Sequence, residues 1–390
     1  MSAAPPCLLP AALGLALAAA VSLGLARFAY ALMLPPMRAD LGWNYVTAGG
    51  MNTLNAAGYL AGALLAPRLF GRHDARALML AGSLGAALLL ALHGATRSDA
   101  GLALLRTATG LASAFSFIGG GLLAARLASA APRRSGLVLG IYYGGVGLGI
   151  VASALMVPPL VEAAPARWPL AWFALAAAAA LCSVLVAAGT RSLVAPPVPG
   201  APRVAFDAGP FAFGLAGYTM FGLGYIAYMT FIVTLLREQG LSSGRVSAFY
   251  ALLGVGVLAS SWLWAGLLQR HRGGRPLALL NGLLALATLL PVLSAQPLVV
   301  YASGALFGSV FLSVVAATTA LVRHNLAPAA WPAGIAAFTI VFAAGQIVGP
   351  TVVGWIADGS GGLARGFAVS AALLALGSLL ASLQRPLPRP

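Results

Sequence analysis

Twelve long apolar runs follow one another through this chain, and each is close to the length of a membrane-spanning helix. The hydrocarbon core of a bilayer is crossed by about 20 apolar residues in helical form. The runs fall in two sets of six, at 11–34, 46–66, 76–94, 101–125, 136–160 and 169–189, then at 209–235, 245–268, 276–294, 297–322, 333–357 and 364–383. The pattern predicts an all-α membrane protein with twelve transmembrane helices.

The composition favours the same class of protein. Hydrophobic residues make up 61% of the 390 residues and charged residues 7%, whereas soluble domains carry on the order of 25% charged residues. The formal net charge of +15 comes from arginines scattered between the apolar runs, so nucleic acid is not an expected partner. The expected partners are the lipid bilayer and a small-molecule substrate. Because no metal-ligand spacing, dinucleotide motif or catalytic constellation is present in the sequence, we expect no enzyme activity, no cofactor and no metal.

The two sets of six runs predict two bundles joined by a linker. The segment 191–208 is rich in proline and lacks periodicity, which separates an N-terminal bundle at 1–190 from a C-terminal bundle at 209–390. The sets also match each other at a constant offset of 198 residues. The matched pairs include Gly24 with Gly222, Tyr30 with Tyr228, Gly42 with Gly240, Gly110 with Gly308, and Gly147 with Gly345. This offset predicts an internal duplication, and such repeats place the substrate site at their interface.

The arginines predict the orientation in the membrane. With the N-terminus in the cytoplasm, 14 of the 22 arginines fall in inner loops or the C-terminus and six in outer loops. Short cytoplasmic loops carry the excess of positive charge, so both termini are expected in the cytoplasm. The remaining two arginines, Arg27 and Arg106, lie inside apolar runs.

Arg27 and Arg106 are the candidate substrate-binding charges. An arginine at the bilayer centre costs about 2.5–3.5 kcal/mol on insertion scales, so each must face a polar group. Both lie at a similar depth below the outer ends of their runs, and no Asp or Glu lies well within any run. Guanidinium groups bind carboxylate or phosphate through two parallel hydrogen bonds, which favours a small organic anion as substrate. The alternative is that each arginine binds backbone carbonyls or water and stabilises helix packing.

Polar and aromatic residues in several runs extend this candidate site. Asn52 and Asn55 share one helical face, and Tyr225 and Tyr228 are the counterparts of Arg27 and Tyr30 in the second repeat. The full set of predicted substrate-binding residues is Arg27, Tyr30, Asn52, Asn55, Arg106, Tyr142, Tyr225, Tyr228 and Gln346. Buried amides and hydroxyls need partners, so these residues should face a cavity or another helix. Packing between helices is the alternative role for each of them. The four histidines, including His93 near the outer end of its run, are expected at membrane interfaces.

Four segments carry motifs of glycine and arginine. They are GALLAPRLFGR after the second run, LLRTATG in the fourth, SGLVLGIYYGGVGLG in the fifth and GLLQRHRGGR after the eighth. Their candidate conformational residues are Gly62, Arg68, Gly71, Arg72, Gly110, Gly144, Gly147, Gly266, Arg270 and Arg275. With these motifs the chain resembles the major facilitator superfamily of transporters. The family carries an aspartate within the first and last of these motifs, but this chain lacks it in the first, and Arg270 takes that position in the last. The segment ARFAYALMLPPMRADLGW together with MNTLNAAGYLAGA most resembles the bacterial YbfB/YjiJ group of that superfamily.

The resemblance implies a monomeric transporter with two six-helix bundles in the cytoplasmic (inner) membrane of a bacterium. It also implies that runs 1, 4, 7 and 10 line a central cavity that opens alternately to the two sides. We therefore expect secondary active transport of a carboxylate-type organic anion. Efflux of neutral or hydrophobic compounds is the first alternative, and a membrane sensor or scaffold without flux is the second. In relatives, the aspartate missing here helps to latch the outward-facing state.

Overall fold

Long helices make up the fold. The computed structural model describes residues 8–162, 164–193 and 206–387, and contains no strand among them. In the first half, the helices are α1 (Leu8–Ala19), η1 (Ala20–Phe28), α2 (Tyr30–Leu41), α3 (Tyr45–Phe70), α4 (Ala75–Gly94), α5 (Asp99–Ala130), η2 (Pro132–Arg134), α6 (Ser135–Glu162), η3 (Pro165–Arg167) and α7 (Trp168–Gly189). In the second half, they are η4 (Gly209–Phe211), α8 (Ala212–Glu238), α9 (Ser243–Leu263), α10 (Ala265–Arg270), α11 (Arg275–Leu293), α12 (Pro297–Asn325), η5 (Pro328–Ala330), α13 (Trp331–Asp358) and α14 (Gly362–Ser382). Residues 194–205 of the predicted linker lie outside the described residues.

The helices confirm the predicted all-α membrane fold. Eleven helical segments of the described chain are long and apolar enough to cross a membrane. Five of these combine several elements. The first runs from Leu8 to Leu41 through α1, η1 and α2, α9 and α10 form another, and in three more a short η helix leads into α6, α7 or α8. The 26-residue helix α3 is the twelfth long segment, and its polar residues, Asn52 and Asn55 among them, make it less apolar.

Helix boundaries follow from local side-chain chemistry. The Asp74 carboxylate accepts a hydrogen bond from the backbone N–H of Ala77 (3.0 Å) and caps the start of α4. Gly42 and Gly240 follow the C-terminal ends of α2 and α8 with φ angles of 68° and 85°. This left-handed backbone favours glycine, which has no Cβ to clash. The two glycines are a pair at the 198-residue offset, so the same helix-ending turn occurs in both repeats.

The described helices group into two compact units. Unit 1 comprises residues 1–42, 54–200 and 243–258. Within it, α6 packs along α1 and η1, and α4 packs against α5 and α7. A Cβ atom added at Gly24 would lie 2.5 Å from the Cα atom of Gly149, so glycine allows η1 and α6 to meet backbone to backbone.

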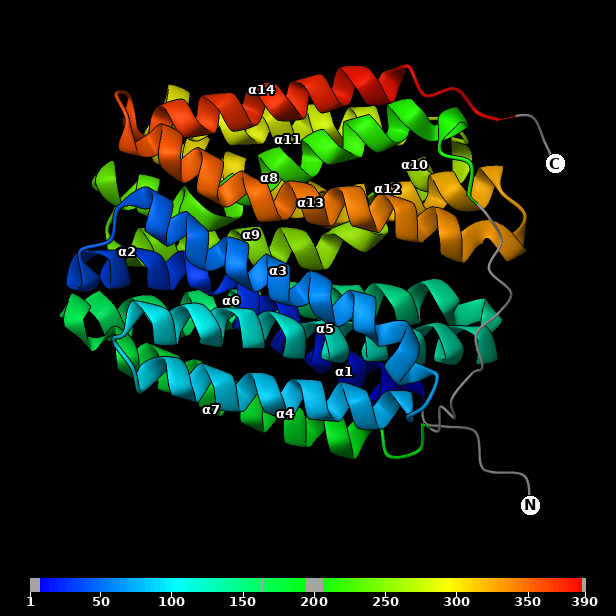
Figure 1. Ribbon diagram of the computed structural model, residues 1–390, viewed down its shortest axis with the longest axis horizontal. Helices are drawn as coiled ribbons and strands as arrows, with labels where there is room; N and C mark the ends of the chain where they lie inside the picture. Colours follow the sequence, from blue (N-terminus) through cyan, green and yellow to red (C-terminus); the bar gives the residue numbers. More distant parts are fainter. Residues whose placement is uncertain (1–7, 163, 194–205, 388–390) are drawn as a thin grey trace. The chain divides into compact units, whose positions relative to one another are not determined.

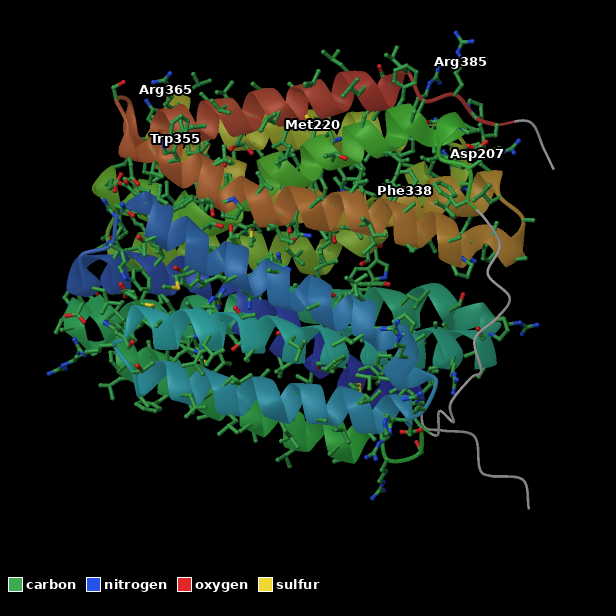
Figure 2. All side chains as sticks on the ribbon, in the orientation of Figure 1. Asp207, Met220, Phe338, Trp355, Arg365 and Arg385 are labelled. Atoms are coloured by element: carbon green, nitrogen blue, oxygen red, sulfur yellow. The ribbon has the colours of Figure 1, made fainter. Side chains whose placement is uncertain are left out.

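Unit 2 comprises residues 43–53, 201–242 and 259–390. Within it, α8 packs against α13 and α14, and α11 packs against α12 and α14 (Figure 1). Gly222, the repeat counterpart of Gly24, lies against Gly345 of α13, so α8 and α13 meet as η1 and α6 do in unit 1. Arg385 and Asp207 lie at one end of this unit, and Trp355 and Arg365 at the other (Figure 2).

Two helices are divided between the units. The first turns of α3 belong to unit 2 and the remainder to unit 1, whereas α9 up to residue 258 belongs to unit 1. The units therefore do not follow the repeats along the chain, and the division into bundles at 1–190 and 209–390 stays a prediction. The first turns of α3 therefore make their contacts within unit 2.

Candidate functional site

Arg27 lies in a widened stretch of the first transmembrane segment. Residues Ala20–Phe28 form the π-helix η1, whose end is marked by a hydrogen bond from the Ala29 N–H to the Gly24 carbonyl (3.0 Å). Arg27 is 5% exposed, and its guanidinium carbon lies 5.6 Å from the centre of the Tyr59 ring. Such a distance suits a cation–π contact. Because π-helical turns occur frequently at functional sites, this geometry favours Arg27 as a functional residue.

Arg106 of α5 contacts both a backbone carbonyl and an aromatic ring. It is 1% exposed and donates a hydrogen bond from Nη1 to the Ala26 carbonyl of η1 (3.2 Å). Its guanidinium carbon lies 4.4 Å from the centre of the Tyr30 ring. Arg27 is close enough for its positive charge to repel that of Arg106. Arg106 therefore links α5 to the π-helical stretch, as the packing alternative for this residue predicts.

Asn55 of α3 fixes the position of the same part of α5. Its Nδ2 donates to the Arg106 carbonyl (3.0 Å), and a Cβ atom at Gly110 would lie 2.0 Å from the Asn55 carbonyl oxygen. The two backbones touch at this point, so only glycine fits at position 110. The side-chain Oδ1 atom of Asn55 is buried and has no hydrogen-bond partner among the described residues. Arg27, Tyr30, Asn55 and Arg106 thus belong to one buried cluster in unit 1.

Tyr142 lies in the same unit but uses its hydroxyl for packing. Its hydroxyl donates to the Phe117 carbonyl of α5 (2.5 Å), and its ring lies 5.5 Å from the Phe117 ring. The side chain is fully buried. These contacts join α6 to α5, and the role of Tyr142 in substrate binding stays a prediction.

Tyr225 and Gln346 form a polar pair in unit 2. The Tyr225 hydroxyl donates to Oε1 of Gln346 (2.8 Å), and both residues are buried. The Tyr225 ring stacks on Phe221 at 4.6 Å, and Phe221 stacks on Phe342 at 5.3 Å. Phe221 and Phe342, which complete this aromatic stack from α8 and α13, are not part of the predicted site. Phe221 and Tyr225 are one helical turn apart, which is the signal that could have revealed it.

Asn52 and Tyr250 are repeat counterparts that make related contacts. The Asn52 Nδ2 donates to the Thr230 hydroxyl (2.7 Å), which donates to the Ile226 carbonyl (2.7 Å). In unit 1, the Tyr250 hydroxyl donates to the Phe28 carbonyl (2.7 Å). Because Phe28 and Ile226 are also a pair at the 198-residue offset, the duplication is visible in side-chain contacts.

Tyr228 lies in the core of unit 2. Its hydroxyl hydrogen-bonds with the Ser303 hydroxyl (2.7 Å), which donates to the Ala287 carbonyl (2.7 Å). Its ring stacks on Phe307 at 3.9 Å between ring centres. These contacts favour a packing role over substrate contact.

Replacing Tyr228 with phenylalanine tests that role. We expect Tyr228→Phe to lower the free energy of unfolding by about 1 kcal/mol, because one buried hydrogen bond is lost and Ser303 retains its bond to Ala287. Transport should stay within about twofold of the wild type, because a packing residue should change the activation barrier for transport by less than 0.5 kcal/mol, which corresponds to about twofold in rate. Thermal unfolding in detergent and initial transport rates measure the two effects. A large loss of transport with normal stability would instead place Tyr228 at the substrate.

The nine predicted substrate-binding residues fall into two groups. Arg27, Tyr30, Asn55, Arg106 and Tyr142 belong to unit 1, and Asn52, Tyr225, Tyr228 and Gln346 belong to unit 2. The first group contains the buried arginine cluster, and the second contains the Tyr225–Gln346 pair together with Asn52 and Tyr228. Their shared role in binding one substrate stays a prediction.

The predicted conformational residues lie where the motifs require. Arg68, Arg72, Arg270 and Arg275 are exposed at or next to helix ends. Gly62 and Gly110 lie where α3 and α5 meet, and Gly147 lies against Gly254 of α9, where an added Cβ atom would be 2.4 Å from the Gly254 carbonyl oxygen. The other members of this set are Gly71, in the turn after α3, Gly144, near Leu258, and the exposed Gly266. Their part in motion stays a prediction.

The acidic residues and His93 have distinct environments. All seven acidic residues lie at helix ends or in connecting segments, as the sequence predicts. His93 lies in the last turn of α4 and is fully buried, and Trp172 of α7 stacks on its ring at 4.6 Å. Its Nε2 atom has no hydrogen-bond partner among the described residues. The described residues include no cluster of three or more His, Cys, Asp or Glu side chains suited to a metal ion.

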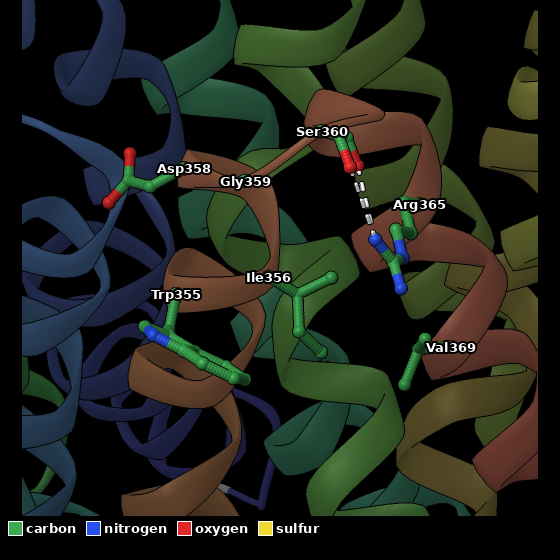
Figure 3. Close-up of a pocket in the computed structure, with 7 residues that line it drawn as sticks. All are labelled: Trp355, Ile356, Asp358, Gly359, Ser360, Arg365 and Val369. Atoms are coloured by element: carbon green, nitrogen blue, oxygen red, sulfur yellow. Dashed lines mark hydrogen bonds between the residues drawn. The ribbon is translucent and has the colours of Figure 1, made fainter.

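A pocket of about 460 Å³ lies at the junction of α13 and α14 (Figure 3). Its lining includes Trp355, Asp358 and Arg365. None of the predicted substrate-binding residues lines it, and Trp355 is 72% exposed. We therefore assign it no role in transport.

Comparisons with known proteins agree with this fold. A sequence model of the family described as "Uncharacterised MFS-type transporter YbfB" matches residues 19–382. A search of curated proteins finds no match. Among solved structures, a bacterial homolog of the human lysosomal transporter Spinster, described as inward-facing and unoccupied, is 14% identical with a TM-score of 0.71, covering 98% of this chain and 99% of that one.

A mutant of the nucleoside transporter NupG is also 14% identical, with a TM-score of 0.73, and the match covers 95% of this chain and 98% of that one. At this identity the two structures establish the shared fold, while the family match establishes the kind of protein. The chain is a transporter, not an enzyme, and it acts on a small molecule in a lipid membrane. It belongs to the major facilitator superfamily (MFS), in the family of YbfB-type MFS transporters.

Proposed function

We propose that this protein is a secondary active transporter of a small carboxylate-type organic anion, working by alternating access. The supporting observation is the pair of buried guanidinium groups of Arg27 and Arg106, which are close enough to repel each other. A bound carboxylate relieves this repulsion and accepts charge-assisted hydrogen bonds. Arginine suits this task because its planar fork matches the two oxygens of a carboxylate.

The residues of the cluster take different parts in this proposal. Arg27 contacts the substrate, because it lies in the π-helical stretch η1 and its planar guanidinium suits bidentate binding of a carboxylate. Arg106 contributes positive charge and holds η1 through the Ala26 carbonyl. The Asn55 Oδ1 atom needs a donor, and a hydroxyl or amino group next to the substrate carboxylate supplies one. Hydroxy- and amino-carboxylates are therefore the preferred substrates.

Orientation and location complete the proposal. The excess of arginine in alternate loops supports cytoplasmic termini in the inner membrane of a bacterium. The chain works as a monomer, with one substrate path per chain. Reporter fusions to the C-terminus, active only in the cytoplasm or only outside it, test this orientation.

Uptake into proteoliposomes tests the substrate class. We expect a labelled hydroxy-carboxylate to accumulate inside the vesicles and unlabelled carboxylates to compete with it. The matching carboxamides, which have nearly the same shape without the charge, should compete at least about 30-fold less well, because a charge-assisted contact of about 2 kcal/mol is lost. Equal competition by acids and amides would contradict an anion site.

The aromatic stack of unit 2 favours a second candidate, efflux of neutral or hydrophobic compounds. Tyr225, Phe221 and Phe342 present flat apolar rings beside a single amide, which suits a broad range of apolar molecules. A resistance screen in a pump-deleted host distinguishes the two functions. Resistance to neutral compounds, with no carboxylate flux in proteoliposomes, would favour efflux.

A further inference from the structure

Asp358, the last residue of α13, completes the first turn of another helix. Its Oδ1 accepts a hydrogen bond from the Tyr45 N–H (2.8 Å) and its Oδ2 from the Val46 N–H (2.9 Å). Tyr45 and Val46 begin α3, and the first four N–H groups of a helix have no acceptor within that helix. The neighbouring Asn44 side chain accepts a hydrogen bond from the Thr47 N–H (2.8 Å). A carboxylate more than 300 residues away in sequence therefore caps the positive end of α3.

The Asp358 carboxylate is directed at α3 although a cation lies on the same pocket wall. Figure 3 shows the Asp358 carboxylate turned away from Arg365, whose Nη1 donates to the Ser360 carbonyl at 3.3 Å. Both residues line the pocket at the junction of α13 and α14. The negative charge of Asp358 thus interacts with a helix terminus rather than with the nearby guanidinium.

Further polar contacts secure the first turns of α3 within unit 2. The Tyr45 hydroxyl donates to Glu238, the last residue of α8. Two turns further along α3, the Thr53 hydroxyl donates to the Ile347 carbonyl of α13 (2.6 Å). Both acids in this contact region, Asp358 and Glu238, lie at helix C-terminal ends.

The helix backbones also touch along this contact. A Cβ atom at Gly49 would lie 2.2 Å from the Pro350 carbonyl oxygen, and one at Gly354 would lie 2.3 Å from the Tyr45 carbonyl oxygen. Glycine on each helix therefore allows α3 and α13 to approach closely. A backbone contact of this kind has few interlocked side chains. The polar groups at the end of the contact therefore determine much of how α3 and α13 align.

α3 makes this contact with only part of its length. Its residues 45–53 belong to unit 2, whereas beyond them Asn55 binds α5 and Gly58 lies against the Thr107 carbonyl in unit 1. Alternating access in transporters of this kind moves one repeat or bundle against the other around a fixed site. With the predicted bundles 1–190 and 209–390 as the moving parts, α3 must release its contact with α13 during that motion.

We propose that Asp358 is a releasable latch. Its hydrogen bonds hold the first turn of α3 on the end of α13 in one state of the transport cycle and break in the other. The transport motion rests on the proposed alternating access, whereas the latch contact itself does not depend on which substrate is carried. The latch lies at the first turn of α3, at the opposite end of that helix from the motif GALLAPRLFGR. Loss of the carboxylate is expected to free the first turns of α3.

Cysteine accessibility tests the latch without any substrate. Met51 is 5% exposed and lies in the part of α3 held in unit 2. In a background with Cys7→Ser and Cys182→Ser, we would place Met51→Cys as the reporter and measure its rate of maleimide labelling in purified protein. Asp358→Asn should accelerate labelling about tenfold, since it weakens two charge-assisted hydrogen bonds.

Val46→Pro is the second variant, because it removes one N–H donor while leaving the acid in place. Proline is tolerated in the first turn of a helix, so the variant should fold. Because it removes one of the two N–H donors to Asp358, it should accelerate labelling about threefold. Glu162→Gln, which removes an exposed acid at the end of α6, is the matched control and should have no effect. Unchanged labelling in both Asp358→Asn and Val46→Pro overturns the latch, and so does equal acceleration in Glu162→Gln. Failure of anion transport would leave these labelling rates unaffected, so the two proposals fail separately.

Discussion

Arg27→Ala is expected to reduce transport of the organic anion about 30-fold or more while the protein remains folded. In the proposed complex, Arg27 and the substrate carboxylate form a buried charge pair. Removing one partner of such a pair costs about 2–5 kcal/mol, and each 1.4 kcal/mol corresponds to a factor of ten. Arg27→Lys should retain an intermediate rate, because lysine keeps the charge but lacks the planar fork. Initial rates in proteoliposomes at equal protein density provide the measurement.

The control for Arg27→Ala is Arg245→Ala, which removes an exposed arginine from the first turn of α9. We expect that variant to transport normally. Arg106→Ala should differ from both, because loss of the bond to the Ala26 carbonyl and of the stack on Tyr30 lowers stability together with transport. Full transport by Arg27→Ala at normal expression would refute its assignment to the substrate.

Gly110→Ala is expected to cause the largest loss of stability among these variants. The added Cβ atom would lie 2.0 Å from the Asn55 carbonyl oxygen, so α3 and α5 must separate. Overpacking of this kind costs about 1–3 kcal/mol, and more where backbone must move. Separation would also weaken the bond from Asn55 to the Arg106 carbonyl, so transport should fall with stability.

Gly136→Ala is the matched control for this glycine. No atom lies within 4 Å of a Cβ placed at Gly136, and alanine favours a helix over glycine by about 1 kcal/mol. We expect an unchanged or slightly higher melting temperature for Gly136→Ala and a clearly lower one for Gly110→Ala, measured by thermal unfolding in detergent. Equal melting temperatures would show that α3 and α5 separate at little cost.

Much of the candidate site could be named from the sequence, but not the partners of its residues. An arginine in an apolar run must face a polar group, and this reasoning identified Arg27 and Arg106. It left open whether each binds substrate or backbone, and the structure shows that Arg106 contacts the Ala26 carbonyl and the Tyr30 ring. The burial of His93 could not be foreseen, because it depends on Trp172 of another helix.

The sequence by itself determined the helices, their approximate ends, the duplication and the family, because these depend on patterns along the chain and need no knowledge of which residues touch. Hydrocarbon requires apolar runs of about 20 residues, and a repeated pattern such as Gly42 and Gly240 can be read directly. Only the tertiary structure decided that Asp358 caps α3, that Asn55 holds α5 and that η1 widens into a π-helix at Arg27. These contacts join residues from about 50 to more than 300 positions apart, or depend on backbone hydrogen bonding, and local patterns carry no information about either.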